Sequence, residues 1–302
     1  MPEAFEHLCD GARRALALSV EERENYMNRD HWVTYPVADT LLSDLQKLLQ
    51  GERVLRMPCR MIYGETNNGK TRLVNRFKKL SPPIETPEGL VVEVLLIDNI
   101  GEASVRGLYN KIIDAFGFPN NPSEQIDKLE FKAYRLLVRY RVRVLALDEF
   151  NAIAQDTPTK QRKFMEKLKA LSNNLKISIV AAGTREAFNV TRLDSQFSNR
   201  FKPLPLDIWT SGDDWDQLLM TFEKLLPLPE PSYLADGRFS RLILANSEGT
   251  IGDAFQLIRE MASYAMHNHK PRVTPDMFAA IDWVPPSERS TVAQKRTARA
   301  IR

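Results

Sequence analysis

Cysteine is scarce in this sequence of 302 residues, which contains only Cys9 and Cys59. Two thiols cannot form the disulfide framework of a small secreted protein, and they cannot complete a four-ligand zinc site by themselves. The opening residues 1–6 are acidic and lack the basic-then-apolar order of a signal peptide. We therefore expect a protein of the reducing cytoplasm.

Long hydrophobic runs, internal repeats and a strong net charge are also absent. No apolar run approaches the roughly 20 residues that cross a bilayer, so we expect no membrane contact. The formal net charge is only +3, so nucleic-acid binding would have to come from a local patch of charge. Hydrophobic residues make up 43% and charged residues 27%, as in an ordinary globular protein with room for one large domain or two smaller ones.

One motif is specific against this ordinary background. Residues 64–71, Gly-Glu-Thr-Asn-Asn-Gly-Lys-Thr, match the phosphate-binding pattern G-x-x-x-x-G-K-[ST] without a mismatch. An apolar run at 59–63 precedes them and an amphipathic run at 73–77 follows, which gives the strand–loop–helix context that the motif requires. The alternative is a glycine-containing surface turn beside a lysine. The context favours a nucleotide-binding protein.

Each part of this loop has a physical role. Gly64 and Gly69 let the backbone fold tightly around phosphate oxygens, while the loop amides and the N-terminus of the next helix attract the anion. Lys70 is predicted to reach the β- and γ-phosphates, and the Thr71 hydroxyl to bind Mg²⁺. The predicted contacts in the loop are Gly64, Glu65, Thr66, Asn67, Asn68, Gly69, Lys70, Thr71 and Arg72.

An aromatic segment lies upstream of the phosphate loop. Residues 31–36 contain Trp32 and Tyr35, and an amphipathic helix is predicted over 38–49. These two aromatic side chains either pack the helix against the core or form a wall of the adenine pocket. The sequence leaves both interpretations open.

Two predicted strands end in carboxylates. Residues 90–97 read as a buried strand that ends before Asp98, and residues 142–147 read as a strand that ends in Asp148 and Glu149. In P-loop enzymes the first carboxylate of such a pair holds Mg²⁺ through water, and the second polarises the attacking water. Asp98 is followed by an asparagine, which cannot act as a base, so Asp148 with Glu149 is the preferred pair. A solvated acidic loop is the alternative.

A third buried strand is predicted over 177–182, and Thr184 follows it. This side chain is placed either to sense the γ-phosphate and position water or merely to cap the next helix. Further on, the segment 196–201 contains Arg200. An arginine there can offset transition-state charge on the nucleotide of a neighbouring subunit, or it can be an ordinary surface residue.

The last third of the sequence is predicted to be helical. Helices over 214–226, 238–246, 251–268 and 275–281 make a small all-α domain. The tail at 285–302 carries one acid, Glu288, against five basic residues and either contacts DNA or an acidic partner or keeps the protein soluble. The basic residues of the tail are Arg289, Lys295, Arg296, Arg299 and Arg302.

The order of these elements resembles the AAA+ ATPases. Within that class, the phosphate loop at 64–71, His-Trp-Val-Thr-Tyr-Pro at 31–36 and Ala-Ala-Gly-Thr-Arg-Glu-Ala at 181–187 are similar to the TniB group of transposition proteins, relatives of TnsC and MuB. The resemblance spans about residues 30–280. It implies an α/β fold with a parallel sheet of strand order 5-1-4-3-2 followed by a small all-α lid. The implied divisions are an N-terminal helical extension with the adenine-side loop (1–50), the ATPase core (51–210), the lid (211–283) and a basic tail (284–302).

The same resemblance implies a function. Such proteins bind ATP and Mg²⁺, assemble as rings or helical filaments on double-stranded DNA, and recruit a DDE transposase (TniA-like) together with a TniQ-like targeting protein. Hydrolysis then disassembles the filament, in the bacterial cytoplasm at the nucleoid. By this resemblance Asp148 and Glu149 are the Walker B pair, with Asp148 and Thr71 on the metal. Thr184 is sensor 1 and Arg200 is the arginine finger.

DNA contacts in this group come from elements after the second strand. Here the resemblance points to Ser104, Arg106, Lys111 and Ser123, with the basic helix at 160–171, which carries Lys163 and Lys167, as the reserve. The lid departs from the pattern of the group. Asp253 stands where relatives often have a sensor arginine, so either Arg259 replaces that arginine or the contact is missing.

Two other functions compete with transposition. A helicase loader or replication initiator would share the fold, but no helix-turn-helix segment is apparent after the lid. A small-molecule kinase would share the phosphate loop, but Glu149 directly after Asp148 favours water as the acceptor.

Overall fold

The computed structural model describes residues 5–98, 104–121, 123–192 and 199–291. The chain forms two compact units. One consists of residues 37–207, and the other combines the described residues before 37 with those after 207. The four-part division predicted above remains a prediction.

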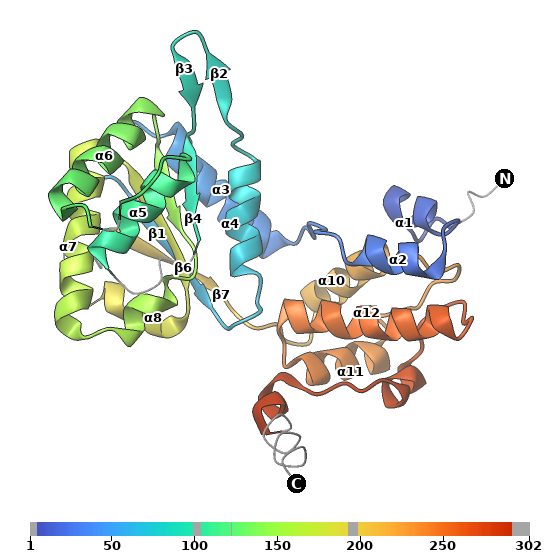
Figure 1. Cartoon of the computed structure of the whole chain (residues 1–302). Coiled ribbons are helices and arrows are strands. Elements are labelled where there is room, and N and C mark those ends of the chain that lie inside the picture. Colours follow the sequence, from blue (N-terminus) through green and yellow to red (C-terminus); the bar gives the residue numbers. More distant parts are fainter. Residues whose placement is uncertain (1–4, 99–103, 122, 193–198, 292–302) are drawn as a thin grey trace. The chain divides into compact units, whose positions relative to one another are not determined.

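The first unit is built on a five-stranded parallel sheet (Figure 1). The strands lie in the order β4-β5-β6-β1-β7. Numbered along the chain and read from the β7 edge, this is the predicted order 5-1-4-3-2, and the α/β fold is confirmed. The strand bounds are Cys59–Gly64 for β1, Val94–Ile97 for β4, Val144–Leu147 for β5, Ser178–Gly183 for β6 and Phe201–Leu206 for β7.

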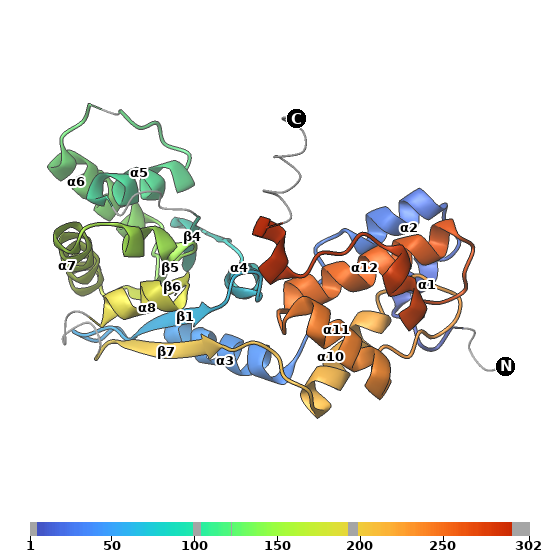
Figure 2. The same cartoon turned by 90° about the horizontal axis from the view of Figure 1, so that it is seen from below.

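Helices cover both faces of this sheet, which explains why β4, β5 and β6 are buried along their whole lengths. Alternate strand residues such as Met61, Leu145 and Ile179 share one apolar core with α5, α6, α7 and α8. Figure 2 shows α7 and α8 on that side and α3 and α4 on the other. The helix bounds are Pro36–Gln50 for α3, Lys70–Lys79 for α4, Val105–Ala115 for α5, Ile126–Arg139 for α6, Pro158–Leu175 for α7 and Arg185–Thr191 for α8.

The apolar run at 90–97 is two strands instead of the single strand that its composition predicts. β3 (Gly89–Val91) pairs with β2 (Ile84–Thr86) in an antiparallel hairpin, and only β4 joins the main sheet. Gly89 has a φ of 121°, a backbone conformation that favours glycine and makes the turn possible. Leu90 is exposed on the hairpin, so hydrophobicity alone does not reveal the break.

The second unit is helical. Trp215 is its largest fully buried side chain, and α2 packs against α12 although the two are far apart in the sequence. A reciprocal pair of hydrogen bonds between Ser19 and Glu22 caps α2. The bounds are Asp10–Ala15 for α1, Val20–Met27 for α2, Asp213–Glu223 for α10, Gly237–Ser247 for α11 and Ile251–His267 for α12, followed by 3₁₀ turns at Pro275–Ala280 and Pro286–Glu288. No helix in the described ranges is both long and apolar enough to span a membrane.

Candidate nucleotide site

The phosphate loop connects the end of β1 to the start of α4. Gly69 precedes the helix with a φ of 90°, and Asn67 also has a positive φ of 59°. Gly64 is required for a different reason, because a Cβ at this position would collide with the carbonyl oxygen of Leu206. The two motif glycines are therefore explained by backbone geometry, one by conformation and the other by close approach.

Asn68 fixes the loop to the neighbouring strand. Its side chain is fully buried, and its Nδ2 donates to the carbonyl oxygens of Leu206 and Asp207, each at 2.9 Å. The amide is thus used inside the protein, and it holds the loop against the end of β7. Glu65, Thr66 and Asn67 are exposed along the rest of the loop, and Arg72 is exposed in the first turn of α4. Their contacts with ATP remain predictions.

Lys70 lies in the mouth of the loop. Only 8% of the residue is exposed, and its Nζ donates to the carbonyl oxygens of Gly64 at 2.9 Å and Glu65 at 2.6 Å. Burial lowers the pKa of Lys70, while the negative charges of Glu149, Asp148 and Glu65 oppose that shift. The Lys70 ammonium therefore lies within the phosphate loop, near the carboxylates of Asp148 and Glu149, and it can bind an anion there.

Asp148 lies at the end of β5 and is 3% exposed. Burial raises the pKa of its carboxyl group, whereas hydrogen bonds from the Thr71 side chain and the Glu149 backbone lower it. The negative charges of Glu149 and Asp98 raise it further. The structure therefore brings the two predicted metal ligands, Thr71 and Asp148, into contact.

This pair of oxygen donors fits Mg²⁺. The ion prefers hard oxygen ligands and is commonly held by one or two carboxylates together with substrate phosphates. A hydroxyl and a buried carboxylate side by side provide such a set. No cluster of three or more histidine, cysteine or acidic side chains suited to a metal occurs in the described part of the chain.

Glu149 is oriented by its backbone and by a neighbour. It adopts a left-handed conformation with φ 51° and ψ 43°, which is uncommon for a residue with a side chain and is typical of functional sites. Asn151 donates from Nδ2 to Glu149 Oε2 at 2.8 Å and accepts from the Thr184 backbone N–H at 2.5 Å. Asn151 was missed by sequence reasoning, because it follows the acidic pair inside a 3₁₀ turn (Phe150–Gln155) and matches no motif.

Thr184 lies between β6 and α8, at the same edge of the sheet as Asp148. It occupies the N-cap position of α8 without a side-chain bond to the helix backbone. Its side chain instead hydrogen-bonds the Glu186 carboxylate and lowers the pKa of that exposed group. Asn151 connects Thr184 to Glu149, so the strand ends share one polar network. The role of Thr184 as a sensor of the γ-phosphate remains a prediction.

Arg200 lies at the amino edge of the sheet, where the strands begin. The phosphate loop, Asp148 and Thr184 lie at the carboxyl edge, where the strands end. Arg200 directly precedes β7, whose first residue, Phe201, pairs with Cys59 at the start of β1. Its Nη1 donates to Asn173 Oδ1 at 2.6 Å, and its carbonyl oxygen accepts from the Cys59 N–H at 3.0 Å. The six residues of β1, at about 3.3 Å each, separate Arg200 from the phosphate loop by about 20 Å. Residues 193–198, which include part of the predicted 196–201 element, lie outside the described residues.

The aromatic residues of the upstream segment belong to the helical unit. The Tyr35 ring packs edge-on against Trp209 with 5.2 Å between centroids, and burial raises the pKa of Tyr35 to about 12. Trp32 is half-buried. Tyr35 therefore packs within the helical unit, while packing of the 38–49 helix by these aromatic side chains and an adenine contact by Trp32 or Tyr35 both remain predictions.

The predicted DNA contacts gather around the start of α5 and the loop before α6. Ser104 caps α5 by accepting from the Gly107 N–H at 2.8 Å, and Arg106 donates to the Glu124 carbonyl oxygen at 2.6 Å. Ser123 precedes that glutamate, while Lys111 is exposed further along the helix. Of the reserve pair, Lys167 forms an ion pair with Glu130 at 2.8 Å, and Lys163 is exposed.

Asp253 stands where the family resemblance led us to expect a sensor arginine. It is buried, accepts from the Thr250 hydroxyl at 2.6 Å and pairs with the Arg289 guanidinium at 2.7 Å. Arg259 instead donates to Asn28 Oδ1 at 3.0 Å. The arginine beside this aspartate therefore comes from the C-terminal segment, a contact that spacing within the helix cannot predict. The other basic residues predicted in the tail, Lys295, Arg296, Arg299 and Arg302, lie outside the described residues.

A parallel sheet of order 5-1-4-3-2, a phosphate loop after its first strand, and an acidic pair at the end of its third strand define an AAA+ ATPase. A family model described as bacterial TniB protein matches residues 23–211, more than half of the sequence. The chain belongs to the TniB family, and it is a transposition-associated AAA+ ATPase.

Solved structures support the fold. The ORC1 protein of Aeropyrum pernix, solved in complex with DNA, is 17% identical with a TM-score of 0.59, over 92% of this chain and 71% of that one. Cdc6p from Pyrobaculum aerophilum is 16% identical with a TM-score of 0.59, over 83% and 68%. A RuvB variant of Thermotoga maritima is 15% identical with a TM-score of 0.50, over 90% and 72%. At these identities the likeness concerns the fold alone. No curated protein matches the sequence.

Proposed function

We propose that this ATPase binds double-stranded DNA without sequence preference, assembles on it as a ring or filament when ATP is present, and recruits a transposase to that DNA. Hydrolysis of ATP then drives disassembly. The observation that carries the proposal is the separation of two groups across the sheet. The phosphate loop, Asp148 and Glu149 lie at one edge, and Arg200 lies about 20 Å away at the other. At that distance Arg200 is far from the nucleotide of its own copy, and we assign it to the nucleotide of a neighbouring copy.

The proposed reaction is hydrolysis of the γ-phosphate. Lys70 binds the β- and γ-phosphates, and Glu149, held by Asn151, takes a proton from the attacking water. The water oxygen bonds to the γ-phosphorus while the bond to the bridging oxygen breaks and its electron pair leaves with ADP. Thr71 and Asp148 would hold Mg²⁺, which supplies positive charge to the phosphates. Thr184 of the same copy and Arg200 of the adjoining copy complete the set of residues that act on the γ-phosphate.

DNA binding is assigned to the surface around the start of α5. Ser104, Arg106, Lys111 and Ser123 offer few charges in one subunit, but an assembly repeats them along the duplex, and phosphate contacts summed in this way are strong and indifferent to sequence. The ORC1 protein was solved in complex with DNA, which supports DNA binding in general and does not bear on the surface used. The expected partners are a TniA-like DDE transposase and a TniQ-like targeting protein.

The test is electron microscopy of the purified protein on plain duplex DNA. We expect rings or filaments with ATP or a non-hydrolysable analogue and none without nucleotide. Glu149→Gln should give assemblies that persist in ATP, because it retains the phosphate contacts and loses the base. Lys70→Ala should give none. Particles that remain single beside DNA in the presence of ATP would contradict the proposal.

The second candidate is a helicase loader or an initiator-like ATPase, favoured by the likeness to ORC1 and Cdc6p. Such a protein would act on a partner helicase or on particular DNA sequences. Binding confined to one sequence, with no assembly on arbitrary duplex, would support this candidate over the transposition regulator.

A further inference from the structure

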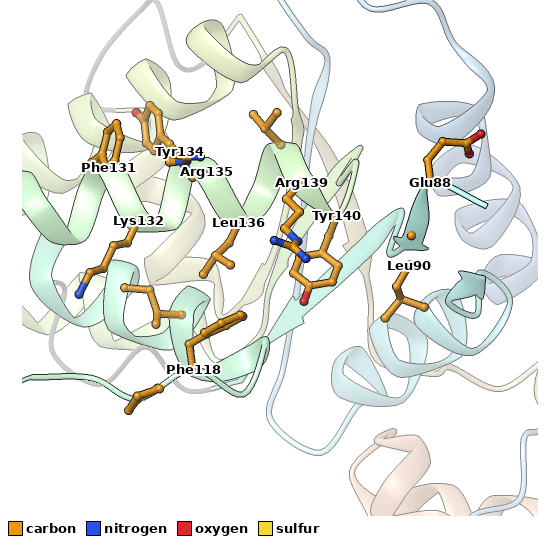
Figure 3. A pocket seen from close by; sticks show the side chains of 14 residues that line it. Glu88, Leu90, Phe118, Phe131, Lys132, Tyr134, Arg135, Leu136, Arg139 and Tyr140 are labelled. Carbon is orange, nitrogen blue, oxygen red and sulfur yellow. The ribbon is translucent and has the colours of Figure 1, made fainter. Parts of the chain in front are cut away.

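The outer side of α6 is hollowed. Side chains from α6, from the segment after α5 and from the turn of the β2–β3 hairpin surround a cavity of about 1040 Å³ (Figure 3). None of the lining residues belongs to the phosphate loop or to the strand-end network. All of them lie within the α/β unit, so the hollow is a feature of one compact body.

The floor and edges of this hollow are apolar and exposed to an unusual degree. Phe131 is 61% exposed and Val138 62%, while Phe118 and Leu90 are 43% and 42% exposed. Phe131 and Val138 are seven residues apart, two turns along the same side of α6. The opposite side of α6 is buried through Leu129, Ala133 and Leu137 and packs α6 onto the core. Packing of α6 onto the core therefore does not explain why Phe131 and Val138 are apolar. Gathered exposed apolar side chains of this kind mark an interaction surface.

The rim of the hollow is positively charged. Lys132, Arg135 and Arg139 line it against one acid, Glu88, which already faces the Arg141 guanidinium at 3.8 Å. Lys132 pairs with Glu124 at 2.8 Å, and the Arg135 guanidinium lies 5.5 Å from the centre of the Phe131 ring. Arg139 is exposed, and the described residues provide it with no ion pair. Two arginines thus offer charge to an incoming ligand directly beside apolar surface.

We propose that this hollow, formed by α6, the segment after α5 and the β2–β3 hairpin, docks an amphipathic helix of a partner protein. Apolar side chains on one face of that helix would fill the space between Leu136, Phe118 and Leu90, and flanking Asp or Glu side chains would pair with Arg139 and Arg135. Charge complementarity selects the acidic helix, since Arg135 and Arg139 remain available once Lys132 is paired with Glu124 and Glu88 faces Arg141. Duplex DNA fits less well, because a phosphate backbone has no apolar groups to cover Phe131 and Val138.

The test uses the full chain without ATP or DNA, so it is independent of the proposed hydrolysis and assembly. A displayed library of helical peptides of about 12–15 residues, with apolar residues at every third or fourth position and random flanks, is selected for binding. Enriched peptides are then measured by fluorescence anisotropy against the parent protein and its variants. We expect Asp and Glu to be enriched at the flanks.

Two variants report on the two parts of the hollow. Phe131→Ser and Arg139→Glu should each weaken the enriched peptides by about tenfold or more, the usual effect of removing an anchor residue. Both side chains are largely exposed, so the fold should tolerate the changes, and circular dichroism verifies this. Leu55→Ser, at an exposed leucine elsewhere on the unit, and Lys78→Glu on α4 are the matched controls and should bind as the parent does.

Five outcomes would overturn the docking site. The first three are equal binding of the enriched peptides to all four variants, selection of basic flanks, and a selection that yields no binder. The fourth is competition by duplex DNA for the same residues, which would make the surface a nucleic-acid site. The fifth is a change in the oligomeric state of the peptide-free protein on Phe131→Ser, which would assign the hollow to a second copy of this chain.

Discussion

The two edges of the central sheet differ in how completely they are built. At the carboxyl edge, Lys70 donates to the backbone of the phosphate loop and interacts with the charges of Asp148 and Glu149. Asp148 also accepts a hydrogen bond from the Glu149 N–H. Most of the groups proposed to act on ATP are thus already in contact there. At the amino edge Arg200 is held by a neutral amide, Asn173, with no described carboxylate beside it. The first edge surrounds the phosphate loop, whereas the half-buried Arg200 at the second lies far from that loop. If Arg200 serves a neighbouring copy, as we propose, a site divided in this way ties catalysis to assembly.

The largest effect is expected at the carboxyl edge. Lys70→Ala removes the ammonium from the phosphate loop, and we expect ATP binding to become undetectable, because the β- and γ-phosphates lose their charged partner. Isothermal titration with ATP and Mg²⁺ measures this. Lys78→Ala, in the last turn of the same helix, is the control. Unchanged affinity in Lys70→Ala would show that the loop is structural.

The amino edge should matter only between copies. Arg200→Ala is expected to lower ATP hydrolysis by about 10³–10⁵-fold in the assembled protein, the range known for arginine fingers. In dilute, unassembled protein the rate should stay the same. Asn173→Ala is the matched control, because it removes the anchor of the guanidinium and keeps the charge. An equal loss at both protein concentrations would point to a folding defect and remove the distinction between the edges.

Local patterns were enough to locate the two main parts of the carboxyl edge. The phosphate loop is a continuous motif, and Asp148 with Glu149 follows a buried strand, so short-range spacing identified each part, and the fold brings their charges together. Their roles toward ATP remain predictions. The sheet order came from the resemblance to a family and was confirmed. These features depend on residues that are close in the sequence or on a shared fold.

Contacts formed through space were not predictable in the same way. Asn151 joins Glu149 to Thr184, which lies 33 residues further along, and Arg289 pairs with Asp253 from beyond the last long helix. The apolar run at 90–97 gave no sign that it divides between the hairpin strand β3, which begins at Gly89, and β4, since Leu90 is as hydrophobic as the buried residues of β4. The hollow beside α6 likewise needs three separated segments. Side-chain type and periodicity do not encode such meetings.

A smaller effect at the carboxyl edge concerns orientation. Asn151→Ala removes the donor that holds Glu149 Oε2, and we expect kcat to fall by about 10- to 100-fold through misplacement of the base. KM for ATP should change little, because the hydrogen bonds of Asn151 within the described residues go to Glu149 and Thr184 and not to the phosphate loop. Steady-state kinetics separates the two constants, and Asn151→Gln tests whether a longer amide restores part of kcat. A rise in KM with kcat unchanged would assign Asn151 to nucleotide binding instead.

The smallest effect should be on thermal stability. Replacing the buried Asp148 should raise the melting temperature, whereas most substitutions of buried residues lower it. Burial raises the pKa of Asp148 in the folded protein, so the charged form is disfavoured there. The cost is absent well below the ordinary pKa of an aspartate, grows as the pH rises through that value to the raised one, and is constant above it. Asp148→Asn can still accept hydrogen bonds from Thr71 and the Glu149 N–H, and it removes the buried charge.

Nucleotide-free Asp148→Asn should therefore melt about 1–4 °C above the parent at pH 7, and the gain should vanish near pH 3. Added Mg²⁺ and ATP should reverse the order, because only the parent retains the carboxylate for the cation. Lys202→Ala, an exposed change near the amino edge that breaks a surface ion pair with Asp44 at 3.3 Å, should give no such gain. A lower melting temperature for ligand-free Asp148→Asn than for the parent would show that the buried charge of Asp148 does not destabilise the fold. The two edges would then differ only in their contacts.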